Sequence, residues 1–237
     1  VRIAEHITGT AKIPEIKVDI PKRLVAVIPG KYTEMPVDEY LVGSGFIIHP
    51  DGYIATNAHV VSVETVKQTL ASESALSALY ENALLLSDGD MQEFLQSETD
   101  NSFSKKVLQY VIEQSIFDLK SEVAVLQPSS LKQQISDLIA EGFPAAIVSM
   151  NENFSEDERD VALLKIEASD LPALALGNSQ SLLVGKKAFI FGFPATAELN
   201  KNSSLEATFT QGVVSAIKQS ANRDFELFQT DGKVSEG

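Results

Sequence analysis

Two acid–base residues of this chain, His59 and Asp160, stand beside apolar stretches. An imidazole can take a proton from a neighbouring hydroxyl, and a carboxylate can hold that imidazole in one tautomer. His59 lies in the segment TNAHVV, directly after a short extended pattern. Taken alone, such a histidine is also typical of a partly buried side chain that is bonded to a backbone carbonyl, so both interpretations stay open. We interpret His6 and His49 as surface or turn residues.

Asp160 opens the segment DVALLKI, at the start of a predicted strand. A carboxylate at that place must be hydrogen-bonded or exposed to solvent. The alternative is an acidic loop end, because Glu156, Asp157 and Glu158 stand close by. Asp157 is also the rival of Asp160 for any functional role, but it lies further from the apolar strand.

The segments around both residues resemble those of the HtrA (Deg) group of trypsin-like serine proteases. GSGFIIHPDGYIATNAHVV (43–61) resembles the stretch that holds the catalytic histidine of that group, and DVALLKI (160–166) resembles the stretch that opens with its catalytic aspartate. Further similar segments follow in family order: LGNS (176–179), VG (184–185), FGFP (191–194), TQGVVSA (210–216) and FQTD (228–231). Together the matches cover most of the chain outside residues 62–120.

This resemblance implies a serine endopeptidase that hydrolyses polypeptides through an acyl-enzyme. His59 would be the general base and Asp160 the residue that orients it. The resemblance implies no metal and no organic cofactor. The main alternative is a catalytically inactive peptide-binding module that kept the fold. A second alternative is an unrelated β-domain in which His59 and Asp160 are coincidental.

The nucleophilic serine of the family is absent from its expected motif. In the family, the segment that resembles FQTD leads to a glycine that opens Gly-x-Ser-Gly-Gly. Gly237 corresponds to that glycine, whose N–H is one donor of the oxyanion hole, and the serine is expected two positions later. Ser235 does not fit, because no Gly-Gly follows it and its spacing from Asp231 is wrong. Val234 is predicted to line the substrate pocket. We therefore expect the chain to be part of a longer protein.

Most of the remaining sequence predicts an all-β fold. Short apolar runs bounded by Gly and Pro are typical of antiparallel barrels or sandwiches, and the resemblance narrows this to two antiparallel β-barrels with the active site at their junction. We expect residues 1–170 to form the N-terminal barrel and residues 171–237 an incomplete C-terminal barrel. Strands are expected at 22–28, 41–48, 53–56, 122–126, 145–150, 161–166, 187–193, 205–218 and 225–229.

The long segment between His59 and Asp160 has a different pattern. From about residue 62 to 120, apolar residues recur at helical spacing, and residues 131–140 predict a further helix. We expect a mainly helical insertion in the first barrel, packed on itself. It is either a tolerated surface insertion, since each doubling of loop length costs only about 0.6 kcal/mol, or a lid or docking arm beside the cleft.

The composition limits the partners of the protein. A net charge of −14 excludes attraction to nucleic-acid phosphates, and the lack of cysteine excludes disulfides and thiolate metal sites. No apolar run reaches the roughly 18 residues that span a bilayer. Because the chain begins at Val1, we expect that an upstream signal or anchor has been removed. The resemblance implies an extracytoplasmic protein, which would be periplasmic, secreted or anchored through that removed segment. The resemblance also allows for a homo-oligomer and a downstream PDZ domain.

Overall fold

The computed structural model describes residues 1–86, 102–126, 134–151, 159–193, 207–219 and 225–233. The chain divides into two compact units. The first unit consists of Val1–His6, Tyr40–Val61 and Glu122–Gly237, and the second consists of Ile7–Glu39 and Ser62–Ser121.

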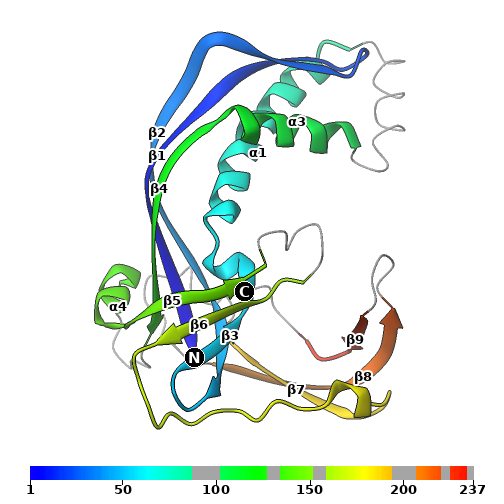
Figure 1. Ribbon diagram of the computed structural model, residues 1–237. Helices are drawn as coiled ribbons and strands as arrows, with labels where there is room; N and C mark the ends of the chain where they lie inside the picture. The colour runs from blue at the N-terminus through cyan, green and yellow to red at the C-terminus, as the bar shows by residue number, and fades with distance from the viewer. Residues whose placement is uncertain (87–101, 127–133, 152–158, 194–206, 220–224, 234–237) are drawn as a thin grey trace. The chain divides into compact units, whose positions relative to one another are not determined.

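Strands dominate the described part of the chain (Figure 1). The strands are β1 (Arg2–Asp19), β2 (Leu24–His49), β3 (Tyr53–Thr56), β4 (Ile116–Leu126), β5 (Phe143–Met150), β6 (Ala162–Ile166), β7 (Lys187–Gly192), β8 (Thr208–Gln219) and β9 (Glu226–Thr230). The helices are α1 (Val63–Ala83), α3 (Ser102–Gln114) and α4 (Ile135–Glu141), with short 3-10 turns at Ala58–Val61 and Ser179–Ser181. The prediction of an all-β fold is confirmed.

The first β-structure is a closed barrel with the strand order β1-β2-β3-β6-β5-β4. The short strand β3 pairs with β2 on one side and with β6 on the other, and Thr56 faces Gly45 across the first ladder and Ala162 across the second. Gly45 leaves room for this packing, because a Cβ there would lie 2.5 Å from the side chain of Ile3 and 3.0 Å from the Ala55 carbonyl oxygen. The buried core residues include Ile3, Ile54, Val61, Val125, Leu164 and Ile166.

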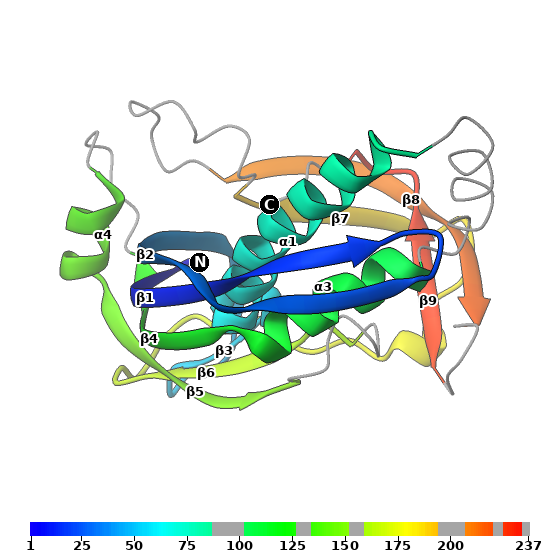
Figure 2. The same cartoon turned by 90° about the horizontal axis from the view of Figure 1, so that it is seen from above.

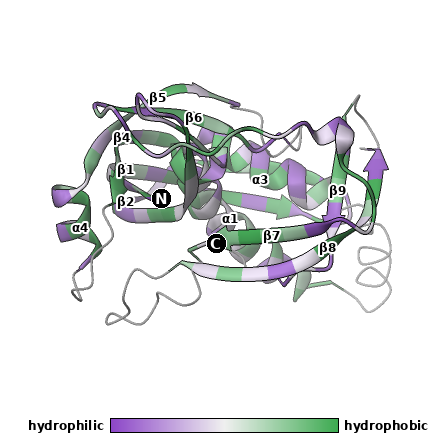
Figure 3. Cartoon of the chain, turned by 90° about the horizontal axis from the view of Figure 1, so that it is seen from below, coloured by the Kyte–Doolittle hydropathy of each residue, from purple (hydrophilic) through white to green (hydrophobic). Residues whose placement is uncertain are grey.

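The second β-structure is a three-stranded antiparallel sheet in the order β7-β8-β9. Phe191 on β7 pairs with Phe209 on β8, and the ladder between β8 and β9 shifts register between Val214 and Ala216. Figure 3 shows hydrophobic residues along β7 and β8. Within the described residues, this sheet is the part of the structure that corresponds to the predicted second barrel. The domain boundary at residue 171 stays a prediction.

The second unit contains the predicted helical insertion. Ser62 caps α1, since its hydroxyl accepts a hydrogen bond from the Glu64 N–H at 3.3 Å. The helices α1 and α3 contact each other. The unit also contains Ile7–Glu39, so the insertion does not pack only on itself. Figure 2 shows β1 and β2 running along these helices. Among the described residues, no helix is long and apolar enough to cross a membrane.

Two predictions about secondary structure are wrong in detail. Residues 116–120 were expected in a helix but belong to β4, because β4 pairs with β1 to close the barrel and tertiary pairing overrides local spacing. Gly9 permits this close approach, since a Cβ there would lie 2.0 Å from the Asp118 carbonyl oxygen. Residues 22–28 and 41–48 were expected as separate strands, yet residues 24–28 and 41–48 belong to the single strand β2, and residues 22 and 23 lie in the turn before it. The helix expected at 131–140 is α4, which begins at Ile135.

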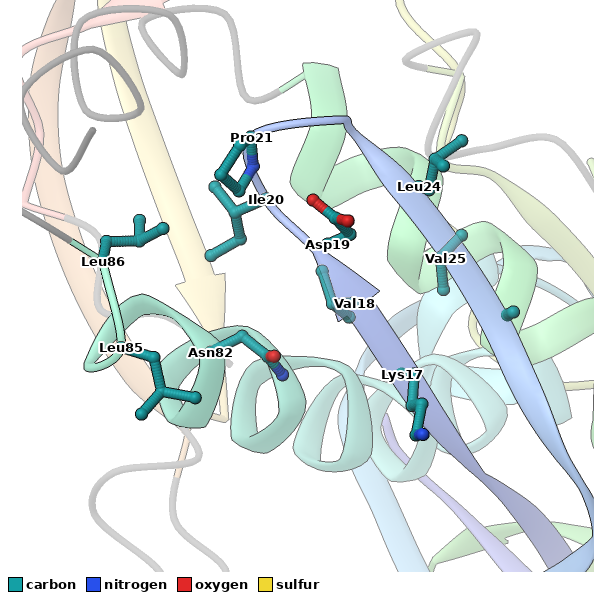
Figure 4. A pocket seen from close by; sticks show the side chains of 11 residues that line it. Lys17, Val18, Asp19, Ile20, Pro21, Leu24, Val25, Asn82, Leu85 and Leu86 are labelled. Atoms are coloured by element: carbon teal, nitrogen blue, oxygen red, sulfur yellow. The ribbon is translucent and has the colours of Figure 1, made fainter.

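A groove of about 530 Å³ lies within the second unit, between the ends of β1 and β2 and the C-terminal end of α1 (Figure 4). Its lining is mainly apolar and includes Val18, Ile20, Leu24 and Leu86. Asp19 at its edge is paired with Lys22, whose Nζ lies 2.8 Å from the carboxylate.

Candidate active site

His59 is presented by a tight turn at the end of β3. The Val60 N–H donates to the Asn57 carbonyl at 3.3 Å, which starts the 3-10 turn Ala58–Val61. Ala58, Val60 and Val61 in this turn are buried. Their burial anchors the turn in the barrel core and leaves the His59 side chain 40% exposed.

Asp160 reaches His59 because of the strand order in the barrel. β3 and β6 are antiparallel neighbours, and Thr56 at the end of β3 pairs with Ala162 at the start of β6. The residues just after β3 therefore lie beside those just before β6. This pairing brings His59 and Asp160 together although a long stretch of chain separates them.

The structure places the two side chains in direct contact. His59 Nδ1 is hydrogen-bonded to Asp160 Oδ2, and the His59 backbone N–H donates to Asp160 Oδ1 at 2.9 Å. The predicted approach of the pair, with Nδ1 facing the carboxylate, is confirmed. Their catalytic roles remain a proposal. The rival Asp157 lies outside the described residues.

The surroundings of Asp160 favour its ionised form. Burial alone would raise the pKa of this carboxyl, but hydrogen bonds from the His59 backbone, the His59 ring and the Asn57 amide together hold the pKa below its usual value. An ionised Asp160 can fix the tautomer of His59 and stabilise an imidazolium at that position.

Asn57 is a residue of this site that sequence reasoning missed. Its amide Nδ2 donates to the Asp160 carbonyl at 3.0 Å and to Asp160 Oδ2 at 3.1 Å. Its place two residues before His59, directly after a strand, was visible in the sequence. Its hydrogen bonds to Asp160 could not be seen in the sequence, because they depend on the register between two strands of the barrel.

Ser44 links the end of β3 to the chain that follows β7. Its carbonyl accepts a hydrogen bond from Thr56 Oγ1 at 2.9 Å, and its hydroxyl accepts one from the Phe193 N–H at 2.7 Å. The segment GSGF of the sequence thus ties the barrel to the three-stranded sheet close to the turn that carries His59.

The segment that leads toward Val234 is held against β8. Asp231 Oδ1 accepts a hydrogen bond from the Val213 N–H at 2.7 Å, and Thr210 Oγ1 donates to the Lys233 carbonyl at 2.8 Å. Gly212 makes room for this contact, because a Cβ there would lie 2.3 Å from the Gly232 nitrogen. The predicted pocket residue Val234 and the predicted oxyanion-hole residue Gly237 themselves lie outside the described residues.

Metal binding has no visible basis in the part of the chain that the structure describes, since no three His, Asp or Glu side chains gather there closely enough to hold an ion. An imidazole hydrogen-bonded to a carboxylate, as His59 is to Asp160, is an arrangement that can take up a proton and stabilise it.

Comparisons with known proteins identify the family of this chain. Residues 43–237 match the family described as the trypsin-like peptidase domain. A probable periplasmic serine endoprotease DegP-like from Pseudomonas fluorescens is 29% identical over 83% of this chain and 25% of its own length. A protein of the same description from Halomonas elongata is 27% identical over the same shares. The mitochondrial serine protease HTRA2 of Drosophila pseudoobscura is 31% identical over 54% of this chain and 28% of its own length.

The chain spans about a quarter of the length of these curated relatives. Among solved structures, the HtrA-type protease AlgW with a decapeptide gives a TM-score of 0.41 at 16% identity, over 98% of this chain and 48% of that one. Deg5 gives a TM-score of 0.40 at 18% identity, over 96% and 70%. The family match covers well over half of the chain and includes both His59 and Asp160, so the chain belongs to the trypsin-like peptidase family, in its HtrA group of serine proteases.

Proposed function

We propose that this chain carries the general base, and the carboxylate that orients it, of a serine endopeptidase that hydrolyses peptide bonds through an acyl-enzyme. His59 is the base and Asp160 orients it. The observation that supports this most directly is the hydrogen bond between His59 Nδ1 and Asp160 Oδ2. It leaves the other ring nitrogen, Nε2, for the proposed proton exchange with the serine.

The proposed reaction follows from this arrangement. As the serine oxygen attacks the scissile carbonyl carbon, Nε2 of neutral His59 takes the hydroxyl proton, and Asp160 stabilises the resulting imidazolium through Nδ1–H. The imidazolium then protonates the leaving amine, the C–N bond breaks, and an acyl ester remains. A water molecule, deprotonated by His59, hydrolyses that ester and regenerates the serine. Asp160 stays ionised throughout, in keeping with the hydrogen bonds that lower its pKa.

The remaining parts of the catalytic machinery are placed by family spacing. The nucleophilic serine stands two positions after Gly237, and the Gly237 N–H is one donor to the oxyanion. Loss of one such donor costs about 10²–10³ in rate. Val234 lines the pocket and favours an aliphatic residue before the scissile bond. The hydrogen bonds that hold residues 231–233 against β8 support this placement, because they fix the chain that leads to Val234.

Fluorophosphonate labelling tests the proposal, because the probe reacts with an activated serine and needs no particular substrate. A protein extended beyond Gly237 by the residues its gene encodes there should be labelled and should cleave polypeptides. The His59→Ala variant should lose labelling and about 10⁴–10⁶ of kcat. His49→Ala is the matched control, since His49 lies beside Asp51 and not beside Asp160.

Two results would contradict the proposal. One is His59-dependent labelling of a serine inside residues 1–237. The other is a gene in which no Gly-x-Ser-Gly-Gly motif follows at the expected place, a result that would favour the inactive peptide-binding module.

We also infer that the protein works outside the cytoplasm on polypeptide substrates. The support is the description of the DegP-like relatives as periplasmic serine endoproteases. Fractionation of the native cells, with detection by an antibody against residues 1–237, should recover the protein outside the cytoplasm. Recovery with cytoplasmic markers would contradict this inference.

A further inference from the structure

The carboxylate of Asp160 is held by three N–H donors rather than by the imidazole alone. The His59 backbone N–H engages Oδ1, while the His59 ring and the Asn57 amide share Oδ2. The same amide also donates to the Asp160 carbonyl. Asn57 thus binds both the side chain and the backbone of the residue that orients His59.

The orientation of the Asn57 amide follows from its partners. The carbonyl and the carboxylate of Asp160 both accept hydrogen bonds and cannot donate when Asp160 is ionised. The NH2 group of Asn57, and not its carbonyl oxygen, must therefore face them. An amide is uncharged at every working pH, so it can hold a carboxylate in place without adding a positive charge that would compete with the imidazolium.

Asn57 is itself fixed by the barrel. It directly follows β3, whose last residue Thr56 is buried and hydrogen-bonded to the Ser44 carbonyl at 2.9 Å. Its own carbonyl accepts the Val60 N–H that starts the 3-10 turn. The amide is therefore presented from the rigid end of a central strand, and not from a long loop.

We propose that Asn57 is a positioning residue that clamps Asp160 so that Oδ2 meets Nδ1 of His59. Without Asn57, the carboxylate would be held only by the ring and the backbone N–H of His59 and could still turn about its side-chain bonds. The contacts of Asn57 with Oδ2 and with the Asp160 carbonyl remove that freedom from both ends of the residue. The geometry of the clamp stands on the contacts alone, while its effect on catalysis rests on the proposed function.

Proton NMR of the chain tests the clamp without any activity. The Nδ1 proton of His59, hydrogen-bonded to the Asp160 carboxylate, should give a strongly downfield resonance. Asn57→Ala should broaden or abolish this resonance while far-UV circular dichroism stays unchanged. Asn57→Asp, which keeps the size but replaces the donor with a second carboxylate, should do the same.

Asn151→Ala is the matched control for this experiment. Asn151 is also an asparagine whose amide donates to a backbone carbonyl of this loop, that of Arg159, at 2.9 Å. This hydrogen bond goes to the backbone of the residue before Asp160 and not to the carboxylate that meets His59, so its loss should leave the resonance intact. An unchanged resonance in both Asn57 variants, or an equal loss in Asn151→Ala, would overturn the clamp.

Kinetics of the extended, active protein give a second readout. Asn57→Ala should lower kcat about 5- to 20-fold with little change in KM, because a positioning residue acts on the transition state and not on substrate binding. An equal loss in Asn151→Ala, or a rise in KM alone, would contradict the proposal. If the extended protein is inactive but the resonance still depends on Asn57, the proposed function fails and the clamp stands.

Discussion

The closed barrel and the three-stranded sheet bury very different shares of their apolar side chains. In the barrel, Ile54 and Leu164 are completely buried, whereas in the sheet Phe191 is 70% exposed and Phe209 is 53% exposed. Closure removes free strand edges and turns one face of every strand inward. The His59–Asp160 pair is built entirely on the barrel, so its geometry rests on the better-buried of the two β-structures.

A pair of glycines shows the same contrast at the level of the backbone. Gly52 in the barrel and Gly185 before β7 both have φ of 87°. A Cβ on Gly52 would lie 2.5 Å from the Ile166 carbonyl oxygen, but a Cβ on Gly185 would meet nothing within 4 Å. At the same backbone conformation, packing in the barrel therefore excludes a side chain at Gly52, whereas the surroundings of Gly185 leave room for one.

The largest expected loss of stability comes from a substitution in the barrel core. Leu164→Ala should lower the free energy of unfolding by about 2–5 kcal/mol, because it removes a buried side chain and leaves a cavity. Urea denaturation followed by circular dichroism measures this. Leu176→Ala is the matched control, since Leu176 is 72% exposed, and it should cost less than about 0.5 kcal/mol. Equal losses in the two variants would contradict the comparison.

The glycine pair separates packing from backbone strain. Gly185→Ala should cost about 1–2 kcal/mol, which is the cost of the left-handed conformation for a residue with a Cβ. Gly52→Ala carries the same strain and a clash with a backbone oxygen as well, so we expect about 2–4 kcal/mol. Thermal and urea unfolding of both variants give the difference. Equal destabilisation would show that the turn at Gly52 can shift without cost.

Asp160 should make the stability of the barrel depend on pH. Its pKa is lowered in the folded protein by hydrogen bonds from His59 and Asn57, so it stabilises the fold above its ordinary pKa of about 3.9 and loses that contribution as the pH falls through the folded value. Asp160→Asn should therefore be less stable than the original protein by about 1 kcal/mol at pH 7.

Urea denaturation at several pH values measures this effect. The difference between Asp160→Asn and the original protein should shrink as the pH is lowered below about 3.9. Glu167→Gln is the control, because the Glu167 side chain is 99% exposed, and it should leave stability unchanged. A difference for Asp160→Asn that grows toward low pH would contradict the assigned direction.

The sequence predicted the parts of the site that local motifs encode. His59 and Asp160 each stand in a short segment with a recognisable pattern, and the antiparallel pairing of β3 with β6 brings them together. Asn57 was missed because its role depends on which residue faces it across the barrel. Residues 116–120 were misassigned for the same reason, since their pairing with β1 outweighs the helical spacing of their apolar side chains.

The length of β2 was also beyond local reasoning. A short strand was expected to end at Ile28, before Pro29, yet β2 continues to His49. Gly30 has φ of 72° and would meet nothing within 4 Å if it carried a Cβ, so the backbone can depart there from extended geometry and resume the strand. Turn-forming residues predict a break in conformation, but they do not predict whether the hydrogen-bonded ladder ends.

The smallest expected change in stability concerns the aromatic residues of the sheet. Phe189 stacks on Phe209 with ring centroids 5.7 Å apart, and Phe191 lies 4.7 Å from the same ring. Because Phe191 is mostly exposed, Phe191→Ser should remove one aromatic contact and lower the free energy of unfolding by less than about 1 kcal/mol. It should nevertheless reduce the binding of a hydrophobic dye and the aggregation of the chain, since exposed apolar patches promote both.

Phe46→Ser is the barrel counterpart, as Phe46 is 43% exposed on β2, and we expect a smaller loss of dye binding. A loss of more than about 2 kcal/mol in Phe191→Ser would mean that the sheet buries its aromatic side chains as the barrel does, and the contrast between the two would not hold.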